Sequence, residues 1–179
     1  TFCVSAAASS VGSIAGQIAR LQGARVIGIA GSPEKCEWVT GELGFDACID
    51  YKREDVAVRL KELAPGGVDI FFDNVGGELL DTVLRRLAMR ARVVLCGDIS
   101  TYQLDGPPPP LHNVRYLMGK RARMEGFNTL DHWDVYQEAA TRLAGWVASG
   151  DVVARTHVLE GLRSEEHTSE LQSRLHLVC

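Results

Sequence analysis

Residues 1–12 read Thr-Phe-Cys-Val-Ser-Ala-Ala-Ala-Ser-Ser-Val-Gly, and this stretch decides the fold. Phe2 to Val4 form a short apolar run of the kind that fills a buried parallel strand. Small residues follow at Ala6, Ser9 and Gly12, where the chain must turn into a helix. Small side chains at such a turn let the first helical amides approach an anion closely. The stretch therefore predicts a strand, turn and helix that bind a nucleotide phosphate, although an ordinary strand-to-helix connection has the same pattern.

The helix that follows should bury an apolar stripe. Ile14, Ile18 and Leu21 recur at helical spacing, which places Gln17 and Arg20 on the opposite face. A glycine at position 23 should close the helix, and residues 25–30 read as a second strand. The amides expected at the phosphate are those of the first turn: Ser9, Ser10, Val11 and Gly12.

The same alternation continues along the chain. Further strands are predicted over 47–51, 68–73, 92–97 and 122–127, and helices over 33–43, 54–63, 80–87 and 131–149. Strands that alternate with helices in this way predict an α/β fold, a doubly wound parallel (Rossmann) sheet of about six strands. Ligands of such sheets bind beyond the carboxyl ends of the strands.

Two later segments break this rhythm. Residues 98–121 should form a long loop that includes the prolines at 107–110, and a long loop that leaves a strand end is usually functional. The last helix is expected to bury an apolar set of residues, and 152–159 reads as a strand that leaves the domain. That apolar set is Trp133, Tyr136, Leu143 and Val147.

The end of the chain differs in character from the rest. Residues 163–179 resemble the in-frame translation of a sequencing-library adapter, so we exclude them from the domain; a natural polar tail is the alternative. The chain also opens inside a predicted strand, so we expect its true N-terminus to be missing.

Composition limits the classes of partner and compartment. The chain has 179 residues, of which 46% are hydrophobic and 23% charged, as expected for one globular domain. A net charge of −4 gives no support for nucleic acid or an anionic membrane as partner. Outside residues 163–179, four scattered cysteines show no metal or redox spacing and predict small buried thiols in a reducing, cytoplasmic setting, with no metal site. They are Cys3, Cys36, Cys48 and Cys96.

Five motifs in order resemble one family. They are Ala-Ala-Ser-Ser-Val-Gly-Ser (7–13), Gly-Ser-Pro-Glu-Lys (31–35), Phe-Asp-Asn-Val-Gly-Gly (72–77), Cys-Gly-Asp-Ile-Ser-Thr-Tyr (96–102) and Met-Glu-Gly-Phe (124–127). Together they look like the cofactor domain of the zinc-independent medium-chain dehydrogenases/reductases, in the group of prostaglandin reductases and NADPH-dependent curcumin reductases. The resemblance implies an NADPH-binding Rossmann domain over 1–151 and, over 152–162, the start of a return segment to a missing catalytic domain.

The end of the second predicted strand favours NADPH (NADP) over NADH. It reads Ala30-Gly31-Ser32, whereas an NAD-binding domain places an acid here that would repel a 2′-phosphate. Lys35 follows one helical turn later, where its ammonium can reach such a phosphate, and Ser32 and Tyr51 add hydroxyl donors. The family resemblance implies the same role for Lys35 and Tyr51. A solvated helix charge is the alternative for Lys35.

The resemblance also implies contacts at the nicotinamide end of the cofactor. The residues concerned follow the fourth, fifth and sixth predicted strands: Asn74, Cys96, Gly97, Asp98, Ile99, Ser100, Phe127, Asn128 and Thr129. Structural alternatives stay open for two of them, since Asn74 can cap a turn and Phe127 can fill a core.

The implied activity is hydride transfer from NADPH to the β-carbon of an α,β-unsaturated ketone or aldehyde, followed by protonation of the α-carbon. Tyr102 is the catalytic candidate, because its phenol can donate a hydrogen bond near the substrate oxygen; packing within a loop is its alternative. The implied partners are a small enone or enal substrate and a second copy of the chain. We expect the chain to be about half of such an enzyme and to be inactive without the other half.

Three other functions compete with this hypothesis. A quinone reductase of the same superfamily shares the fold, and a protein that binds NADPH without turnover shares the site. A methyltransferase shares the sheet but normally has an acid after the second strand, which this chain lacks.

Overall fold

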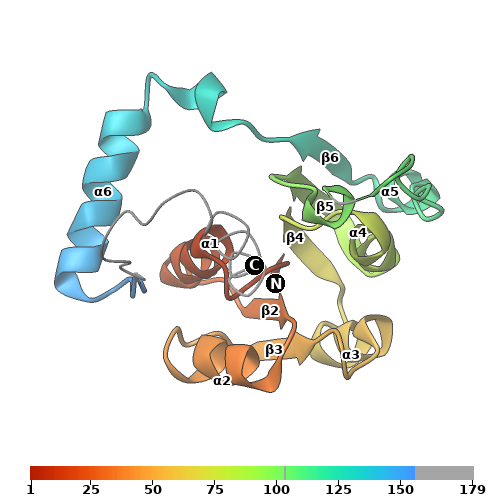
Figure 1. Cartoon of the computed structure of the whole chain (residues 1–179), viewed down its shortest axis with the longest axis horizontal. Helices are drawn as coiled ribbons and strands as arrows, with labels where there is room; N and C mark the ends of the chain where they lie inside the picture. Colours follow the sequence, from red (N-terminus) through yellow and green to blue (C-terminus); the bar gives the residue numbers. More distant parts are fainter. Residues whose placement is uncertain (103, 156–179) are drawn as a thin grey trace, which may run out of the picture.

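The computed structural model describes residues 1–102 and 104–155 and contains one parallel sheet with helices on both sides (Figure 1). The strand order is β3-β2-β1-β4-β5-β6, so the order reverses between β1 and β4. The predicted doubly wound sheet of six strands is confirmed. The strands are β1 (Phe2–Val4), β2 (Val26–Ala30), β3 (Ala47–Asp50), β4 (Val68–Asp73), β5 (Leu87–Leu95) and β6 (Arg123–Gly126).

Helices connect these strands and cover the two faces of the sheet (Figure 1). The α-helices are α1 (Ser10–Leu21), α2 (Pro33–Gly41), α3 (Val56–Leu63), α4 (Gly77–Leu84), α5 (Arg115–Lys120) and α6 (Tyr136–Ser149). Two short 3-10 helices, η1 (Ile99–Thr101) and η2 (Thr129–His132), follow β5 and β6. The predicted N-cap of α2 is confirmed, since the Ser32 hydroxyl accepts a hydrogen bond from the Lys35 amide at 3.3 Å.

The core consists of two apolar clusters, one on each face of the sheet. The cluster under α3 and α4 is built around Phe71 and Leu84. The cluster under α1 and α2 is built around Val39 and Phe45. Both faces of the central strands are therefore buried. This burial explains why β1 and β2 consist of unbroken apolar residues.

The face that α1 buries differs from the predicted one. Gly12, Ser13, Gly16 and Gln17 are buried, whereas the predicted apolar stripe is only half-buried. Because glycine has no side chain, this face brings the helix axis closer to the sheet than a leucine face could. The prediction that Gln17 lies on the opposite face to the packing surface was therefore wrong.

Gln17 has a specific role in this packing. Its side-chain amide donates to the Val153 carbonyl at 3.0 Å, and its side-chain oxygen accepts from the Val153 amide at 2.7 Å. The pair attaches the end of the described chain to α1, 136 residues away in sequence. Residues 152–155 accordingly form no strand, and the rest of the predicted strand over 152–159 lies outside the described residues, as does the tail over 163–179.

Helix α6 is the largest departure from the prediction. It begins at Tyr136, after η2, and none of its residues is buried. Trp133, Tyr136 and Val147 are exposed, and Leu143 is half-buried, so the expectation that these four side chains are buried was wrong. Apolar spacing identifies the face that could pack, but it does not supply a neighbour.

Three smaller predictions also need correction. Leu87 is buried but starts β5 rather than ending a helix, so β5 begins five residues earlier than predicted. The predicted loop over 98–121 contains the short helix α5. Cys3 is buried as predicted, whereas the other three described cysteines are partly exposed, and the thiols of Cys36 and Cys48 lie beside each other.

The glycine face of α1 leads to a prediction about stability. A Cβ atom added at Gly16 would lie 2.0 Å from the ring of Phe45, so Gly16→Ala should lower the free energy of unfolding by about 1–3 kcal/mol through overpacking. Chemical denaturation measures this change. The matched control is Gly145→Ala in α6, where no atom lies within 4 Å of the added Cβ, and this change should stabilise the chain by about 0.5–1 kcal/mol. Equal effects of the two substitutions would contradict the packing argument.

Candidate functional site

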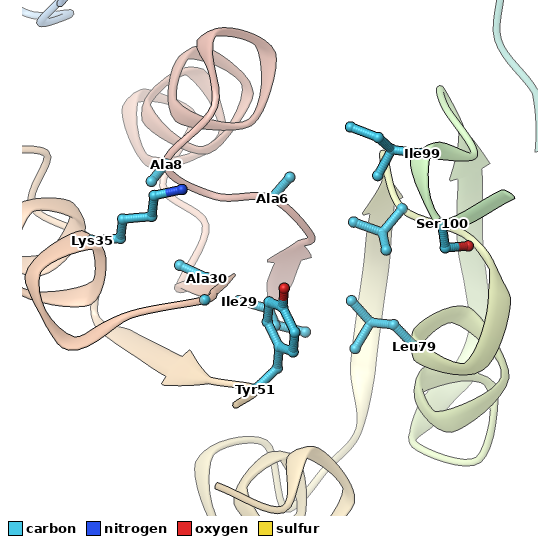
Figure 2. A pocket seen from close by; sticks show the side chains of 11 residues that line it. Ala6, Ala8, Ile29, Ala30, Lys35, Tyr51, Leu79, Ile99 and Ser100 are labelled. Carbon is cyan, nitrogen blue, oxygen red and sulfur yellow. The ribbon is translucent and has the colours of Figure 1, made fainter. Parts of the chain in front are cut away.

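A cavity of about 330 Å³ lies at the carboxyl ends of the central strands (Figure 2). Lys35 and Ala8 stand on one side of it, and Leu79, Ile99 and Ser100 stand on the other, with Tyr51 between them. The cavity therefore occupies the place where parallel sheets bind ligands. It is lined by Ala6, Ala8, Ile29, Ala30, Gly31, Lys35, Tyr51, Val75, Leu79, Ile99 and Ser100.

The turn from β1 into α1 forms one wall of the cavity. Ala6 has a φ of 48°, in the left-handed region that glycine adopts most easily, so alanine stands here under strain. A Cβ atom at Gly12 would lie 2.2 Å from the Ala6 carbonyl oxygen, so only glycine fits at that position. The predicted small-residue turn is therefore confirmed as a close backbone contact.

The N-terminus of α1 provides polar groups at this turn. The Ser9 hydroxyl accepts from the Gly12 amide at 3.0 Å and caps the helix. The amides of Ser10 and Val11 stand in the first turn, where no intrahelical acceptor exists. With the positive end of the helix dipole, they form a surface suited to an anion.

The connection from β2 to α2 forms the second wall. Gly31 and Lys35 both line the cavity, and a Cβ atom at Gly31 would lie 2.9 Å from the Tyr51 ring, so glycine leaves room for that ring. Hydrogen bonds from its own backbone amide and from Ser32 lower the pKa of the Glu34 carboxyl, which stays ionised at the start of α2. Lys35 is thus the residue that brings a positive charge to the lining.

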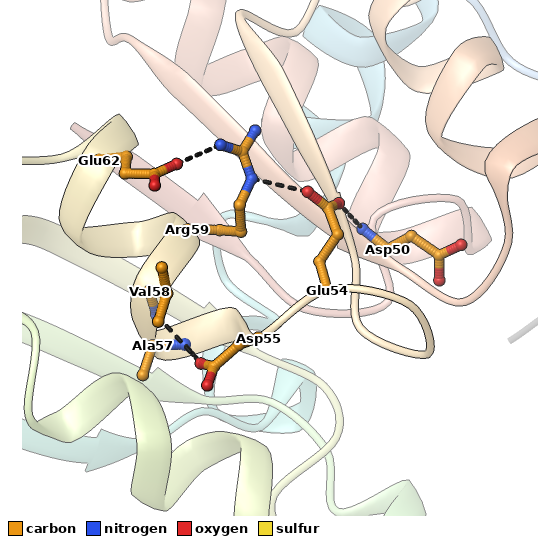
Figure 3. A network of polar contacts seen from close by, with 7 residues as sticks. All are labelled: Asp50, Glu54, Asp55, Ala57, Val58, Arg59 and Glu62. Atoms are coloured by element: carbon orange, nitrogen blue, oxygen red, sulfur yellow. Dashed lines mark hydrogen bonds and ion pairs between the residues drawn. The ribbon is translucent and has the colours of Figure 1, made fainter.

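Polar contacts close the turn that follows β3 (Figure 3). The Glu54 carboxylate accepts from the Asp50 amide at 2.9 Å and forms an ion pair with Arg59 at 2.6 Å. Arg59 also pairs with Glu62, and the Asp55 carboxylate caps α3 by accepting from the amides of Ala57 and Val58. This network closes the turn that contains Tyr51, one of the residues in the cavity lining.

The ends of β1 and β4 are tied together beside the cavity. The Ser5 hydroxyl donates to the Asp73 carboxylate at 2.7 Å and accepts from the Asn74 amide at 2.8 Å. The Asn74 side chain donates to the Ser5 carbonyl at 2.9 Å. Asn74 therefore cross-links the ends of β1 and β4.

Asp73 is a fully buried carboxylate in this cross-link. Burial raises its pKa, and the Asp98 carboxylate raises it further, whereas hydrogen bonds from Ser5 and the amides of Val75 and Gly76 lower it. Those amides donate at 3.1 and 3.0 Å. The carboxylate therefore organises the turn that leads into α4 and carries the cavity residue Val75.

The segment after β5 reaches the cavity by close contact with a glycine pair. A Cβ atom at Gly76 would lie 1.9 Å from the Asp98 carboxylate, and one at Gly77 would lie 2.6 Å from the Ser100 hydroxyl. Both glycines have positive φ. The amides of Cys96 and Gly97 donate to the Asp73 carbonyl, so Ile99 and Ser100 are directed into the lining.

The remaining predicted residues lie outside the cavity lining. Phe127 stacks on His132 with ring centres 5.1 Å apart, and the Asn128 side chain caps η2, which begins at Thr129. Tyr102 ends η1 with 72% of its surface exposed. The structure therefore brings Lys35, Tyr51, Ile99 and Ser100 together but does not place Tyr102 or 127–129 beside them.

Several residues of the site were missed in the sequence. Ser5 and Asp73 carry the cross-link, and Ile29, Val75 and Leu79 line the cavity. An acid at the end of an apolar strand, directly before Asn-Val-Gly-Gly, was the signal that could have identified Asp73. Its partner Ser5 lies 68 residues away, so spacing could not reveal the pair.

Residues 1–102 and 104–155 contain neither a candidate metal site nor a candidate membrane-spanning helix. No group of three or more His, Cys, Asp or Glu side chains could hold a metal ion there. No helix in this part of the chain is long and apolar enough to span a membrane.

Comparison with known proteins gives consistent matches. A family model described as zinc-binding dehydrogenase matches residues 10–145. The chain is 40% identical over 165 residues to the NADP(+)-dependent 2-alkenal reductase of Nicotiana tabacum, covering 92% of this chain and 48% of the relative. It is 41% identical over 167 residues to prostaglandin reductase 1 of Oryctolagus cuniculus, with 92% and 47% covered. The chain thus spans about half the length of the curated relatives it matches.

Solved structures agree with these matches. The chain resembles CurA from Vibrio vulnificus in complex with NADPH at a TM-score of 0.85 and 40% identity, covering 94% of this chain and 51% of CurA. It also resembles the quinone oxidoreductase of Escherichia coli complexed with NADPH at a TM-score of 0.74 and 28% identity, with 87% and 47% covered.

The cross-link between β1 and β4 leads to a second prediction. Ser5→Ala removes the donor to Asp73 and the acceptor of the Asn74 amide, so it should lower the free energy of unfolding by about 1–3 kcal/mol. Denaturant titration measures the loss. Ser13→Ala is the matched control, because Ser13 is also buried but its hydroxyl donates only to the Ser10 carbonyl within α1. A control variant that loses as much stability as Ser5→Ala would disprove the special role of Ser5.

The same variant should change the titration of Asp73. Because the folded-state pKa of Asp73 is raised, the folded protein takes up this proton before the unfolded chain as the pH falls. The contribution of Asp73 to stability therefore rises as the pH falls through its folded-state pKa and is complete below the unfolded value. Ser5→Ala removes a hydrogen bond that lowers the pKa, so the carboxyl midpoint seen by carbon NMR should move to higher pH. An unchanged midpoint would show that Ser5 does not act on the carboxylate.

Proposed function

Because the chain belongs to the zinc-binding dehydrogenase family, we propose that it binds NADPH and forms the cofactor-binding part of a reductase of carbon-carbon double bonds. The substrates we propose are α,β-unsaturated ketones or aldehydes. The observation that carries the proposal is the cavity at the strand ends, with Lys35 and Tyr51 in its lining. The similarity to an alkenal reductase, a prostaglandin reductase and an NADPH-bound CurA supports the same class.

The residues of the cavity fit a dinucleotide. The small residues of the turn at Ala6 and Ala8 line the cavity directly before the first-turn amides of α1, and we assign Ser9, Ser10, Val11 and Gly12 to the pyrophosphate. We assign Lys35, Ser32 and Tyr51 to the 2′-phosphate of NADPH. The Ser32 hydroxyl accepts from the Lys35 amide and donates to the Glu34 carboxyl, so to bind a phosphate it would turn its one proton from Glu34 to that phosphate.

The residues after β4, β5 and β6 complete the proposed site. Asn74 and the segment 96–100 stand beside the cross-linked strand ends, where the reactive end of the cofactor would lie. Phe127, Asn128 and Thr129 follow β6 and would close the far side. Tyr102 is proposed as the group that donates a hydrogen bond to the substrate oxygen.

NADPH, when bound, supplies the hydride that a double bond conjugated to a carbonyl accepts at its β-carbon. The chain's own residues would bind the cofactor and orient it. Lys35 and the α1 amides hold the phosphates, and the cross-link of Ser5, Asp73 and Asn74 keeps the wall beside them rigid. The Tyr102 side chain is exposed, and we propose that its phenol donates to the substrate oxygen.

The domain boundaries belong to the same proposal. We assign 1–151 to the NADPH-binding domain, 152–162 to the return segment and 163–179 to an adapter-derived tail. The attachment of Val153 to Gln17 supports a change of role near 152, since the chain there leaves α6 and crosses α1. On this reading the chain alone has no reductase activity.

Two alternative functions also use NADPH but differ in what the bound cofactor reduces. A quinone acceptor is favoured by the likeness to the quinone oxidoreductase of E. coli, although at 28% identity it is the weaker match. Binding of NADPH without turnover is the other. With a chain extended to the full length of its relatives, oxidation of NADPH by an enone supports the main proposal, oxidation by a quinone alone supports the first alternative, and oxidation by neither supports the second.

We propose further that the chain pairs as a homodimer. The edge strand β6 leaves one side of its backbone unpaired by any described strand, and such edges readily pair with a second chain. Light scattering should then give twice the mass of one chain. A monomeric mass would refute the pairing.

The phosphate site gives the central prediction. Lys35→Ala should weaken NADPH binding by about one to two orders of magnitude, because a charge-assisted contact contributes roughly 1.5–3 kcal/mol. NADH binding should not change, since NADH has no 2′-phosphate. Fluorescence titration of the chain with each nucleotide measures both affinities.

Lys61→Ala serves as the matched control, because Lys61 is an exposed lysine on α3 away from the cavity lining. It should leave both affinities unchanged. If NADH binds the unmodified chain as tightly as NADPH, the assignment of Lys35 is wrong. If neither nucleotide binds a folded chain, the cavity is not a sufficient dinucleotide site.

A further inference from the structure

Exposed arginines gather around the starts of β5 and β6, two strands that lie side by side (Figure 1). The segments 85–92 and 115–123 hold eight of the 19 lysines and arginines of the chain and no acidic residue. The first runs from the end of α4 into β5, and the second is α5 and the start of β6. We name the exposed arginines of these segments the basic surface: Arg85, Arg90, Arg92, Arg115, Arg121 and Arg123.

Contacts show that the two segments form one surface. The guanidinium groups of Arg115 and Arg85 both lie beside the Tyr116 phenol and lower its pKa. Arg121 donates to the Met89 sulfur at 3.2 Å, which joins the end of α5 to the start of β5. Arg92 and Arg123 are direct neighbours in the register of β5 and β6.

These positive charges lack compensation within the described chain. None of the six arginines takes part in an ion pair among residues 1–102 and 104–155. Like charges that lie opposite each other on neighbouring strands destabilise a sheet. Arg92 and Arg123 form such a pair between β5 and β6. The chain as a whole has a net charge of −4, so this concentration does not follow from composition.

Backbone strain is found at the same place. Three described residues other than glycine have positive φ: Ala6 at the cavity, and Arg90 and Arg121 in the basic surface. Their φ angles are 62° for Arg90 and 51° for Arg121, in the left-handed region that favours glycine. Strained residues persist mainly at functional sites. Arg121 ends α5 in the left-handed conformation common at helix ends, so the strain at Arg90 is the observation that adds to the charge.

We propose that the basic surface docks an acidic segment of a partner protein. Guanidinium groups bind carboxylates through paired hydrogen bonds, so a row of arginines suits a carboxylate-rich chain. Met89, Met118 and Val114 are exposed among them and add apolar contact. Arginine, methionine and tyrosine are enriched at protein interfaces.

A nucleic acid suits this surface less well. Binding of single strands without sequence preference relies on open aromatic faces for stacking. The Tyr116 ring already carries the Arg115 guanidinium, 5.4 Å from its centre. The exposed apolar groups are methionine and valine, which contact aliphatic side chains rather than stack on bases.

The test is binding of a fluorescent peptide of repeating Glu-Glu-Leu units to the full chain, followed by anisotropy. The peptide should bind the chain. Its affinity should fall about tenfold between roughly 0.05 and 0.3 M salt, because salt screens exposed charge pairs. The triple variant Arg90→Gln, Arg115→Gln, Arg121→Gln should weaken binding by about tenfold or more. It should not change nucleotide binding, because none of these residues lines the cavity.

The control triple variant is Arg20→Gln, Lys61→Gln, Arg142→Gln, which removes the same charge from exposed positions elsewhere. It should leave peptide affinity within about twofold of the unmodified chain. Equal loss in both triple variants would overturn the proposal in favour of general electrostatic attraction. Binding of an oligouridylate with no binding of the peptide would overturn it in favour of nucleic acid.

Single glycine variants separate function from folding. Arg90→Gly and Arg121→Gly relieve a positive φ, so each should raise the melting temperature by about 1–4 °C. Each substitution should also weaken peptide binding, because it removes an arginine from the basic surface. A variant that gains stability and keeps full peptide affinity would show that the strained arginines do not serve binding.

Discussion

The hydrogen bond between Ser5 and Asp73 joins β1 to β4 at the point where the strand order reverses. Both side chains are fully buried, and this bond gives the Ser5 hydroxyl proton its acceptor. The same carboxylate accepts the amides that begin the turn into α4, and its residue's carbonyl accepts the amides after β5. One wall of the cavity therefore depends on a single buried acid and its serine.

The opposite wall of the cavity depends on glycines, which have no side chain. Gly12 lies against the Ala6 carbonyl, Gly16 against Phe45, and Gly28 against Ala7, each too close for a Cβ atom. These contacts bring α1 close to the sheet and leave its first-turn amides beside the cavity. Ala6 holds a strained conformation in the same turn, which shows that the geometry is imposed by packing rather than by local preference.

The two ends of the sheet have different chemistry. At the carboxyl ends the lining is small and apolar, and Lys35 contributes its positive charge. At the starts of β5 and β6, exposed arginines stand side by side without acidic neighbours in their own segments. A parallel sheet creates the first environment by its connections alone, because its crossovers leave a crevice at the carboxyl ends. The second arises from the particular residues of this chain.

Local signals in the sequence determined the sheet, the bounds of β4 over 68–73 and the start of α2 at Pro33, because periodicity and capping act within a few residues. They also identified Lys35 and Tyr51, which the structure brings to one cavity. Tertiary structure alone decided that Gln17 packs inward to bind Val153, that Asp73 meets Ser5, and that α6 fully buries none of its side chains. The physical reason is that a pattern shows which face of an element can be buried, whereas the neighbour that buries it lies far away in the chain.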